Sequence, residues 1–112
     1  MKILVFAGTT EGRRIAEYLN DTVADSYVSV ATEYGGRLLE EYQHLHLLTG
    51  RMDEDDITAF LSEKEIDLVI DATHPFAVLV TGNIKRACER AEVRYLRCLR
   101  EEEHLAEEME PN

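Results

Sequence analysis

The chain has 112 residues, 45% of them apolar and 31% charged, and a formal net charge of −11 at pH 7. This length suits one domain with a single modest core, and so acidic a chain lacks the basic face that nucleic acids and anionic membranes bind. No apolar run approaches the roughly 20 residues of a membrane span, and no cleavable leader is visible.

The chain opens with an apolar run that turns into a helical pattern within a few residues. Residues 2–7 are predicted to form a strand, and a helix is expected to follow it as far as Asn20, with Ile15, Ala16 and Leu19 on its buried side.

The turn between this strand and this helix is the first candidate site. Unpaired N–H groups at the start of such a helix form a binding site for anions, most often phosphate. Gly8 permits a close approach, and Thr9 and Thr10 supply hydroxyls. The full dinucleotide fingerprint is absent, because Thr10 and Arg13 replace its second and third glycines.

Hydrophobic periodicity and turn residues define the later elements. The expected strands are 27–31, 44–48, 67–71 and 93–99, the last near a sheet edge. A short helix ending at Tyr42 is expected between the first two of these strands. A helix capped by Asp53, with Ile57, Phe60 and Leu61 on its apolar face, should follow the second, and a helix with Pro75 in its first turn should follow the third.

The helix that begins at Pro75 has a sustained apolar stripe, with Thr73 or His74 expected just outside it. The side chains predicted to be buried are Ala77, Val80, Ile84, Ala87, Cys88 and Ala91, and Gly82 marks a close packing contact. Cys88 and Cys98 lack a metal-binding spacing, so we expect reduced core thiols and a cytoplasmic protein.

Strands that alternate with helices predict an α/β fold with a Rossmann-like, doubly wound, five-stranded parallel sheet of order 3-2-1-4-5. The order reverses between the first and fourth strands, so the turn at Gly8 and the segment 71–74 should line one crevice. We assign residues 1–100 to this domain and 101–112 to an acidic helix or tail.

Four arginines follow predicted strands, namely Arg13, Arg14, Arg37 and Arg51. Each of these arginines taken alone can be an ordinary solvated surface residue. As a group they are candidates for binding an anion, because an acidic protein that binds an anion needs local positive charge.

The turn after the second strand is a candidate site for an adenosine ribose. Glu33 lies 25 residues after Gly8, about where dinucleotide folds place their ribose-binding acid. A 2′-phosphate would instead use hydroxyls and a cation, which Thr32 and Arg37 provide. Both readings stay open, with a preference for NADP.

The turn after the fourth strand carries Asp71, Thr73 and His74. A lone histidine there is usually structural, and an aspartate can be a simple turn acceptor. Their expected place opposite Gly8 makes His74 a candidate proton donor or orienting group.

Other polar residues give weaker evidence for a functional site. His44 and His46 share one face of a strand but lack a third metal ligand, so we expect no metal site. Tyr95, Arg97 and Arg100 could bind carboxylates or lie solvated on an edge strand, and no Ser/His/Asp or Cys/His nucleophile system is visible.

Five short segments in this order resemble the N-terminal half of the precorrin-6A reductase (cobalt-precorrin-6A reductase) family of cobalamin biosynthesis. They are Ala7-Gly8-Thr9-Thr10-Glu11-Gly12, Ala31-Thr32-Glu33-Tyr34-Gly35, Gly50-Arg51-Met52-Asp53, Asp71-Ala72-Thr73-His74-Pro75-Phe76-Ala77 and Tyr95-Leu96-Arg97.

The resemblance implies an NADPH-dependent oxidoreductase that reduces a double bond of a tetrapyrrole macrocycle, a precorrin with or without cobalt. It implies roles for three groups of residues: Gly8, Thr9, Thr10 and Glu11 with Thr32 and Arg37 for the cofactor, Asp71, Thr73 and His74 for the nicotinamide and substrate crevice, and Arg97 and Arg51 for substrate carboxylates.

The family's chain continues into a second α/β domain, which this sequence lacks, so we expect that domain in the same or another chain. Arg100 is followed by Glu101, where the family tends to have Pro. The alternative function is a non-catalytic, nucleotide-binding regulatory or interaction module. A phosphoacceptor receiver domain is disfavoured, because Phe6-Ala7-Gly8 lacks the paired acids that it needs.

Overall fold

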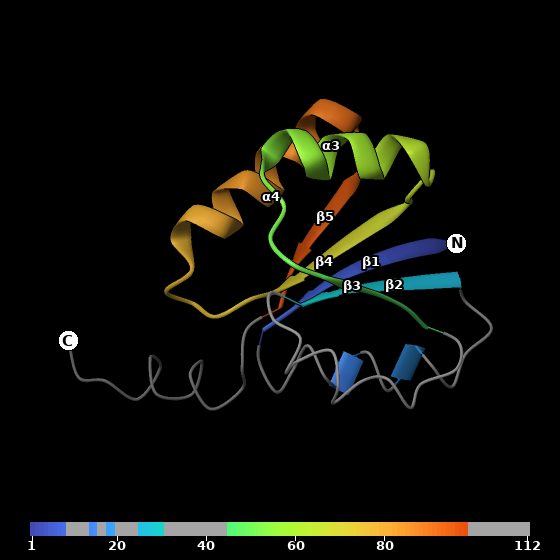
Figure 1. Ribbon diagram of the computed structural model, residues 1–112, viewed down its shortest axis with the longest axis horizontal. Coiled ribbons are helices and arrows are strands. Elements are labelled where there is room, and N and C mark those ends of the chain that lie inside the picture. Colours follow the sequence, from blue (N-terminus) through green and yellow to red (C-terminus); the bar gives the residue numbers. More distant parts are fainter. Residues whose placement is uncertain (9–13, 16–17, 20–24, 31–44, 99–112) are drawn as a thin grey trace.

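A computed structural model describes residues 1–8, 14–15, 18–19, 25–30 and 45–98 of the chain. They form one five-stranded sheet of order β3-β2-β1-β4-β5 in which every neighbouring pair is parallel, as the sequence predicted (Figure 1). The strands are β1 (Lys2–Ala7), β2 (Asp25–Val30), β3 (Leu45–Thr49), β4 (Leu68–Ala72) and β5 (Arg94–Arg97).

The central strand β1 is apolar on both faces, because helices cover both sides of a parallel sheet of this kind. Leu4 and Phe6 pack with Ile57, Leu61, Ile84 and Ala87, which come from helices α3 (Glu54–Glu63) and α4 (Val78–Ala91). On the other face, Ile3 and Val5 pack against Leu19. Of the helix predicted up to Asn20, the structure describes Arg14, Ile15, Tyr18 and Leu19, all helical.

Helix α3 begins as predicted. The Asp53 carboxylate accepts the N–H of Asp56 at 2.8 Å, and the Asp56 carboxylate accepts the N–H of Asp53 at 3.2 Å. This reciprocal capping box satisfies two N–H groups that would otherwise lack partners at the start of the helix. Ile57 and Leu61 are buried, while Phe60 is half-buried.

Helix α4 corrects the prediction. It begins at Val78, not at Pro75, and neither Thr73 nor His74 caps it, because Ala77 holds the N-cap position without a side-chain bond. Pro75 instead lies in a turn that the bond from Ala77 N–H to the His74 carbonyl closes at 2.9 Å. Proline fits the second position of such a turn as well as the first turn of a helix.

The burial of α4 follows the predicted stripe except near its start. Ile84, Ala87 and Cys88 are buried as expected, Ala77 and Ala91 are half-buried, and the prediction for Val80 is wrong because that side chain is 41% exposed. A Cβ on Gly82 would meet the Arg86 guanidinium of the same helix at 3.2 Å, so its close contact lies within α4.

The remaining boundaries differ by small amounts. Strand β2 begins two residues earlier than expected, β3 and β4 begin one residue later, and β5 is shorter but lies at the sheet edge as predicted. The helix expected before Tyr42 and the tail 101–112 fall outside the described residues. None of the described helices has the length and hydropathy that a membrane span requires.

Candidate functional site

The turns after β1 and β4 meet at the carboxyl edge of the sheet. Gly8 N–H donates to the Ala72 carbonyl at 3.3 Å, which continues the β1–β4 pairing past the strand ends. A Cβ on Gly8 would lie 3.5 Å from the Thr73 Cα atom and 3.8 Å from the His74 nitrogen. The expected meeting of these two turns is confirmed at Gly8, at the point where the strand order reverses.

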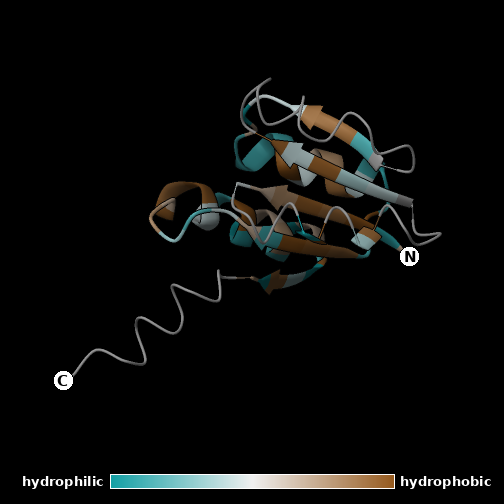
Figure 2. Ribbon diagram, turned by 90° about the horizontal axis from the view of Figure 1, so that it is seen from below, coloured by the Kyte–Doolittle hydropathy of each residue, from teal (hydrophilic) through white to brown (hydrophobic). Residues whose placement is uncertain are grey.

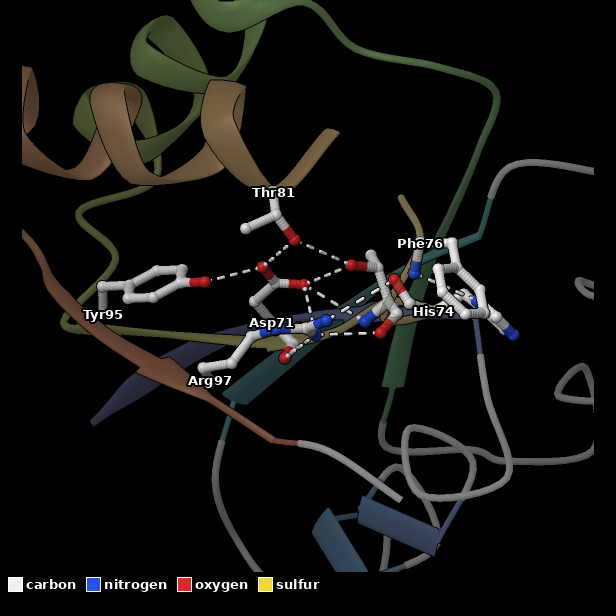
Figure 3. Close-up of polar contacts among 7 residues, drawn as sticks. Asp71, His74, Phe76, Thr81, Tyr95 and Arg97 are labelled. Atoms are coloured by element: carbon white, nitrogen blue, oxygen red, sulfur yellow. Dashed lines mark hydrogen bonds and ion pairs between the residues drawn. The ribbon is translucent and has the colours of Figure 1, made fainter. Parts of the chain in front are cut away.

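Asp71 organises the β4 side of this edge. Its carboxylate is fully buried and accepts hydrogen bonds from three segments of the chain (Figure 3). Oδ1 accepts from Thr73 N–H at 3.1 Å and from the Thr73 hydroxyl at 2.7 Å, and Oδ2 accepts from the Thr81 hydroxyl at 2.8 Å and the Tyr95 hydroxyl at 2.7 Å. The side chain therefore joins the turn after β4 to α4 and β5.

These donors decide the charge of Asp71. Burial raises the pKa of the carboxyl, but the hydrogen bonds from Thr73, Tyr95 and Thr81 outweigh it, so the pKa lies below its usual value of 3.8. Asp71 is thus ionised at neutral pH, with its oxygens engaged and no exposed surface. Such a carboxylate can position a turn, whereas a carboxyl group that donates a proton needs a free, protonated oxygen.

Arg97 completes the cluster from β5, where it lies opposite Asp71 in the strand register. Its Nη1 group donates to the Thr73 carbonyl at 2.8 Å and to the Asp71 carbonyl at 3.0 Å, and lies 3.3 Å from Asp71 Oδ1. Arg97 is therefore not a solvated edge arginine. It fixes the backbone of the turn that carries His74.

Thr81 is a neighbour of Asp71 that the sequence did not assign, whereas Tyr95, a candidate for binding carboxylates, binds the carboxylate of Asp71 itself. Tyr95 precedes Arg97 by two residues, so strand alternation already placed both side chains on one face. Burial, together with the bond to Asp71, raises the pKa of the Tyr95 hydroxyl well above its usual value. Burial, and then the charge of Asp71, also raises the pKa of the Cys88 thiol to about 11.

His74 lies exposed on the same turn. Its Nδ1 atom accepts the Phe76 N–H at 3.2 Å, and its ring lies 5.2 Å from the Phe76 ring. Because Nδ1 accepts this bond, we infer that the neutral ring carries its proton on Nε2. The turn thus presents an N–H donor at the sheet edge beside Gly8.

Arg51 lies at the far end of the same edge. It follows Gly50, whose φ is +101° and whose N–H donates to the Val30 carbonyl at 3.0 Å, so the turn after β3 closes against the end of β2. Arg51 is exposed there, four strand intervals or about 19 Å from the end of β5.

The other predicted site residues lie outside the described part of the chain. They are Thr9, Thr10, Glu11, Arg13, Thr32, Glu33, Arg37, His44 and Arg100. His46 is exposed on β3, and its ring stacks on Tyr27 at 4.8 Å. Within the described residues no three His, Cys, Asp or Glu side chains gather in a metal-binding cluster, and neither Cys88 nor Cys98 forms a disulfide.

Comparison with known proteins shows which family the chain matches. The sequence model described as precorrin-6x reductase CbiJ/CobK matches residues 2–111. A Methanocaldococcus jannaschii protein named cobalt-precorrin-6A reductase is 31% identical over 94% of this chain and 42% of its own length. A Salmonella typhimurium protein of the same name is 35% identical over 90% of this chain and 38% of its own length.

A solved structure titled CobK precorrin-6A reductase superimposes on this fold with a TM-score of 0.76 and 31% identity, over 87% of this chain and 38% of the other. The chain therefore spans about two fifths of the length of these relatives.

Proposed function

The chain belongs to the precorrin-6x reductase family, and we propose that it is the cofactor-binding part of an NADPH-dependent reductase acting on precorrin-6A or cobalt-precorrin-6A in cobalamin biosynthesis. The observation that carries this proposal is the contact of Gly8 with Thr73 and His74 at the strand-order reversal. Nucleotides bind at this position of open α/β sheets. Cysteines that form no disulfide suit the cytoplasm, where this enzyme would act.

The described residues fit a nucleotide cofactor at this edge. Gly8 is exposed, and its missing side chain leaves the backbone accessible where a pyrophosphate would lie. We assign Thr9, Thr10 and Glu11 to the pyrophosphate, and Thr32 and Arg37 to the phosphorylated ribose. NADPH, when bound, supplies the hydride that reduces the macrocycle.

On the opposite side of Gly8, the chain's own residues would orient the reacting groups. The ionised Asp71 carboxylate and the Arg97 guanidinium hold Thr73 and the backbone of His74 in place. Asp71 then contributes to catalysis as a positioning residue. His74, which is exposed at this edge, is the candidate proton donor to the atom of the double bond that does not take up the hydride.

Two arginines remain candidates for substrate carboxylates. Arg51 and Arg97 lie about 19 Å apart along the edge, so they would contact different groups of a substrate that carries several carboxylates. Three acceptors already engage or approach Arg97 Nη1, and Nη2 donates to the His74 carbonyl at 3.5 Å, so a carboxylate would bind at Nε or at the second N–H of Nη2.

Calorimetric titration with NADPH and NADH tests the cofactor assignment. We expect Gly8→Ala to weaken NADPH binding about tenfold or more, because the added methyl group would stand where the ligand approaches. The folded chain should tolerate it, since the new Cβ would make an ordinary 3.5 Å contact with Thr73. Arg94→Ala, at the opposite edge of the sheet, is the control. Failure of the folded wild-type chain to bind either nucleotide would reject the proposal.

The preference for NADPH has its own test. Arg37→Ala should weaken NADPH more than NADH, because only NADPH carries the 2′-phosphate. Equal losses for the two nucleotides would remove that assignment. Reductase activity on the macrocycle, with the remainder of a relative supplied in trans, would exclude a purely regulatory module.

A further inference from the structure

The start of α4 and the turn before it carry a run of exposed apolar side chains. Phe76 is 86% exposed, Val78 74%, Leu79 76% and Val80 41%. We call these residues the Phe76 patch. Figure 2 shows the hydrophobic end of this helix at the margin of the molecule, away from the strands. Groups of exposed apolar side chains often mark interaction sites in soluble proteins.

The fold does not need this patch. Ile84, Ala87 and Cys88 bury the helix against the sheet, and Thr81 ties its first turns to Asp71. Helix α3, by contrast, starts with Glu54, Asp55 and Asp56 behind an aspartate cap, as suits a helix end that faces water. The first turn of α4 has no acidic residue and no side-chain cap.

The described chain ends near the turn that precedes the Phe76 patch. Cys98 N–H donates to the Asp71 carbonyl at 2.9 Å, so the chain leaves β5 beside the turn that leads to Phe76. The relatives named cobalt-precorrin-6A reductase have roughly three fifths of their length outside the matched region, since the match covers 42% of one and 34% of another. A second copy is a poor occupant, because each copy carries a net charge of −11.

We propose that the Phe76 patch is the docking surface for a second domain that corresponds to the unmatched part of these relatives. This inference rests on the proposed function, in which that domain completes the reductase. Docking there would place the second domain against the turn that carries His74, and so beside the cofactor edge.

Hydrogen exchange tests the proposal on a fusion of this chain to the unmatched part of the M. jannaschii relative. The first N–H groups of a helix lack partners within it, so the amides of Val78, Leu79 and Val80 exchange quickly unless covered. Peptides spanning 76–80 should exchange at least roughly tenfold more slowly in the fusion than in the 112-residue chain. Leu79→Glu should abolish this protection without moving the urea midpoint of the isolated chain, because Leu79 faces water there.

Several outcomes would overturn the inference. In one outcome both parts of the fusion unfold cooperatively, which shows that both are folded, but residues 76–80 exchange as fast as in the isolated chain. This result would contradict the inference. Protection already present in the isolated chain would point to residues 99–112 if the sample is monomeric, or to a second copy if sedimentation shows a dimer that Leu79→Glu dissociates.

If the fusion does not fold, the full-length M. jannaschii enzyme serves instead, with glutamate at the position aligned with Leu79. We expect limited proteolysis to separate its two parts faster than in its wild type, and an unchanged rate would contradict the inference. NADPH titration of the same samples separates the two proposals. NADPH binding without protection removes only the docking surface, and protection without NADPH binding removes only the cofactor assignment.

Discussion

Two carboxylates hold α4 to the rest of the molecule, and they do so in opposite surroundings. Asp71 is fully buried and binds Thr81 near the start of the helix. Glu54 of α3 is reached from solvent and pairs with Arg86 at 2.6 Å and Arg90 at 3.0 Å near its end, where Arg90 also pairs with Asp55 at 2.7 Å. Both carboxylates have several donors, and hydrogen bonds lower the pKa of both.

The difference lies in what happens when a partner is lost. Water replaces the lost partner of an exposed ion pair, so the pair adds little to stability. A buried charge or hydroxyl that loses its partner has no water to turn to, and it carries the full cost of desolvation. Similar lists of contacts therefore predict very different effects of mutation.

The largest effect should come from Asp71→Ala, which leaves Thr81, Tyr95 and Arg97 without their shared acceptor. We expect a loss of about 3–5 kcal/mol in the free energy of unfolding, measured by urea denaturation. Asp71→Asn keeps the shape and one acceptor, and serves if the alanine variant does not fold. A loss no larger than that of Glu54→Ala would contradict the comparison.

Removing one donor at a time should have a smaller effect. Thr81→Val and Tyr95→Phe each delete one hydrogen bond to Asp71, and each should lower the free energy of unfolding by about 1–3 kcal/mol. Tyr18→Phe, at a side chain that is 70% exposed, is the matched control. Because both donors reach Oδ2, the double variant should lose less or more than the sum of the single losses. Strict additivity would mean that the donors act independently.

The bond between Tyr95 and Asp71 should make the stability of the wild-type protein depend on alkaline pH. The pKa of Tyr95 is raised in the fold, so the folded hydroxyl stays protonated where the unfolded tyrosine ionises, and stability falls as the pH rises above 10. The raised pKa of Cys88 contributes a loss that begins near pH 9. Thermal melts from neutral to strongly alkaline pH should show a shallower decline in Tyr95→Phe than in the wild type, and Cys88→Ala separates the second contribution. Identical declines in all three would argue against this coupling.

The smallest effect should come from Glu54→Gln. Arg86 and Arg90 can turn to water or, for Arg90, to Asp55, so the urea midpoint should stay within error of the wild type. Repeating the measurement at low and high salt sharpens the comparison, since salt screens only exposed pairs strongly. A midpoint that falls as far as in Tyr95→Phe would show that exposure does not distinguish the two anchors.

The sequence was informative where one local rule governs the structure. The buried run in β1 and the aspartate cap of α3 each follow from residues close together in the chain, and the parallel order followed from their alternation. Pro75 was misread because proline suits a turn and a helix start equally well. Val80 shares a helix face with the buried Ile84, but it lies in the first turn of α4 and is 41% exposed.

The site was less predictable, because its contacts join distant residues. The bonds from Thr73 to Asp71 fit the turn acceptor that the sequence allowed, but the donors Thr81, Tyr95 and Arg97 lie 10, 24 and 26 positions away, and no local pattern predicts them. The predicted cofactor residues from Thr9 to Glu11, together with Thr32 and Arg37, stay predictions. Gly8 and His74, whose neighbourhood depends only on the strand order, came together as expected.

The order of the strands along the chain also affects when the sheet can be completed during synthesis. β5 is the last strand of the sheet to leave the ribosome, and it pairs with β4, where it delivers Tyr95 and Arg97 to Asp71. Gly8 is synthesised almost first, but the turn that faces it acquires its final shape only after residue 97 has emerged. A nascent chain stopped before β5 would leave β4 as an unpaired edge strand, open to pairing with another chain.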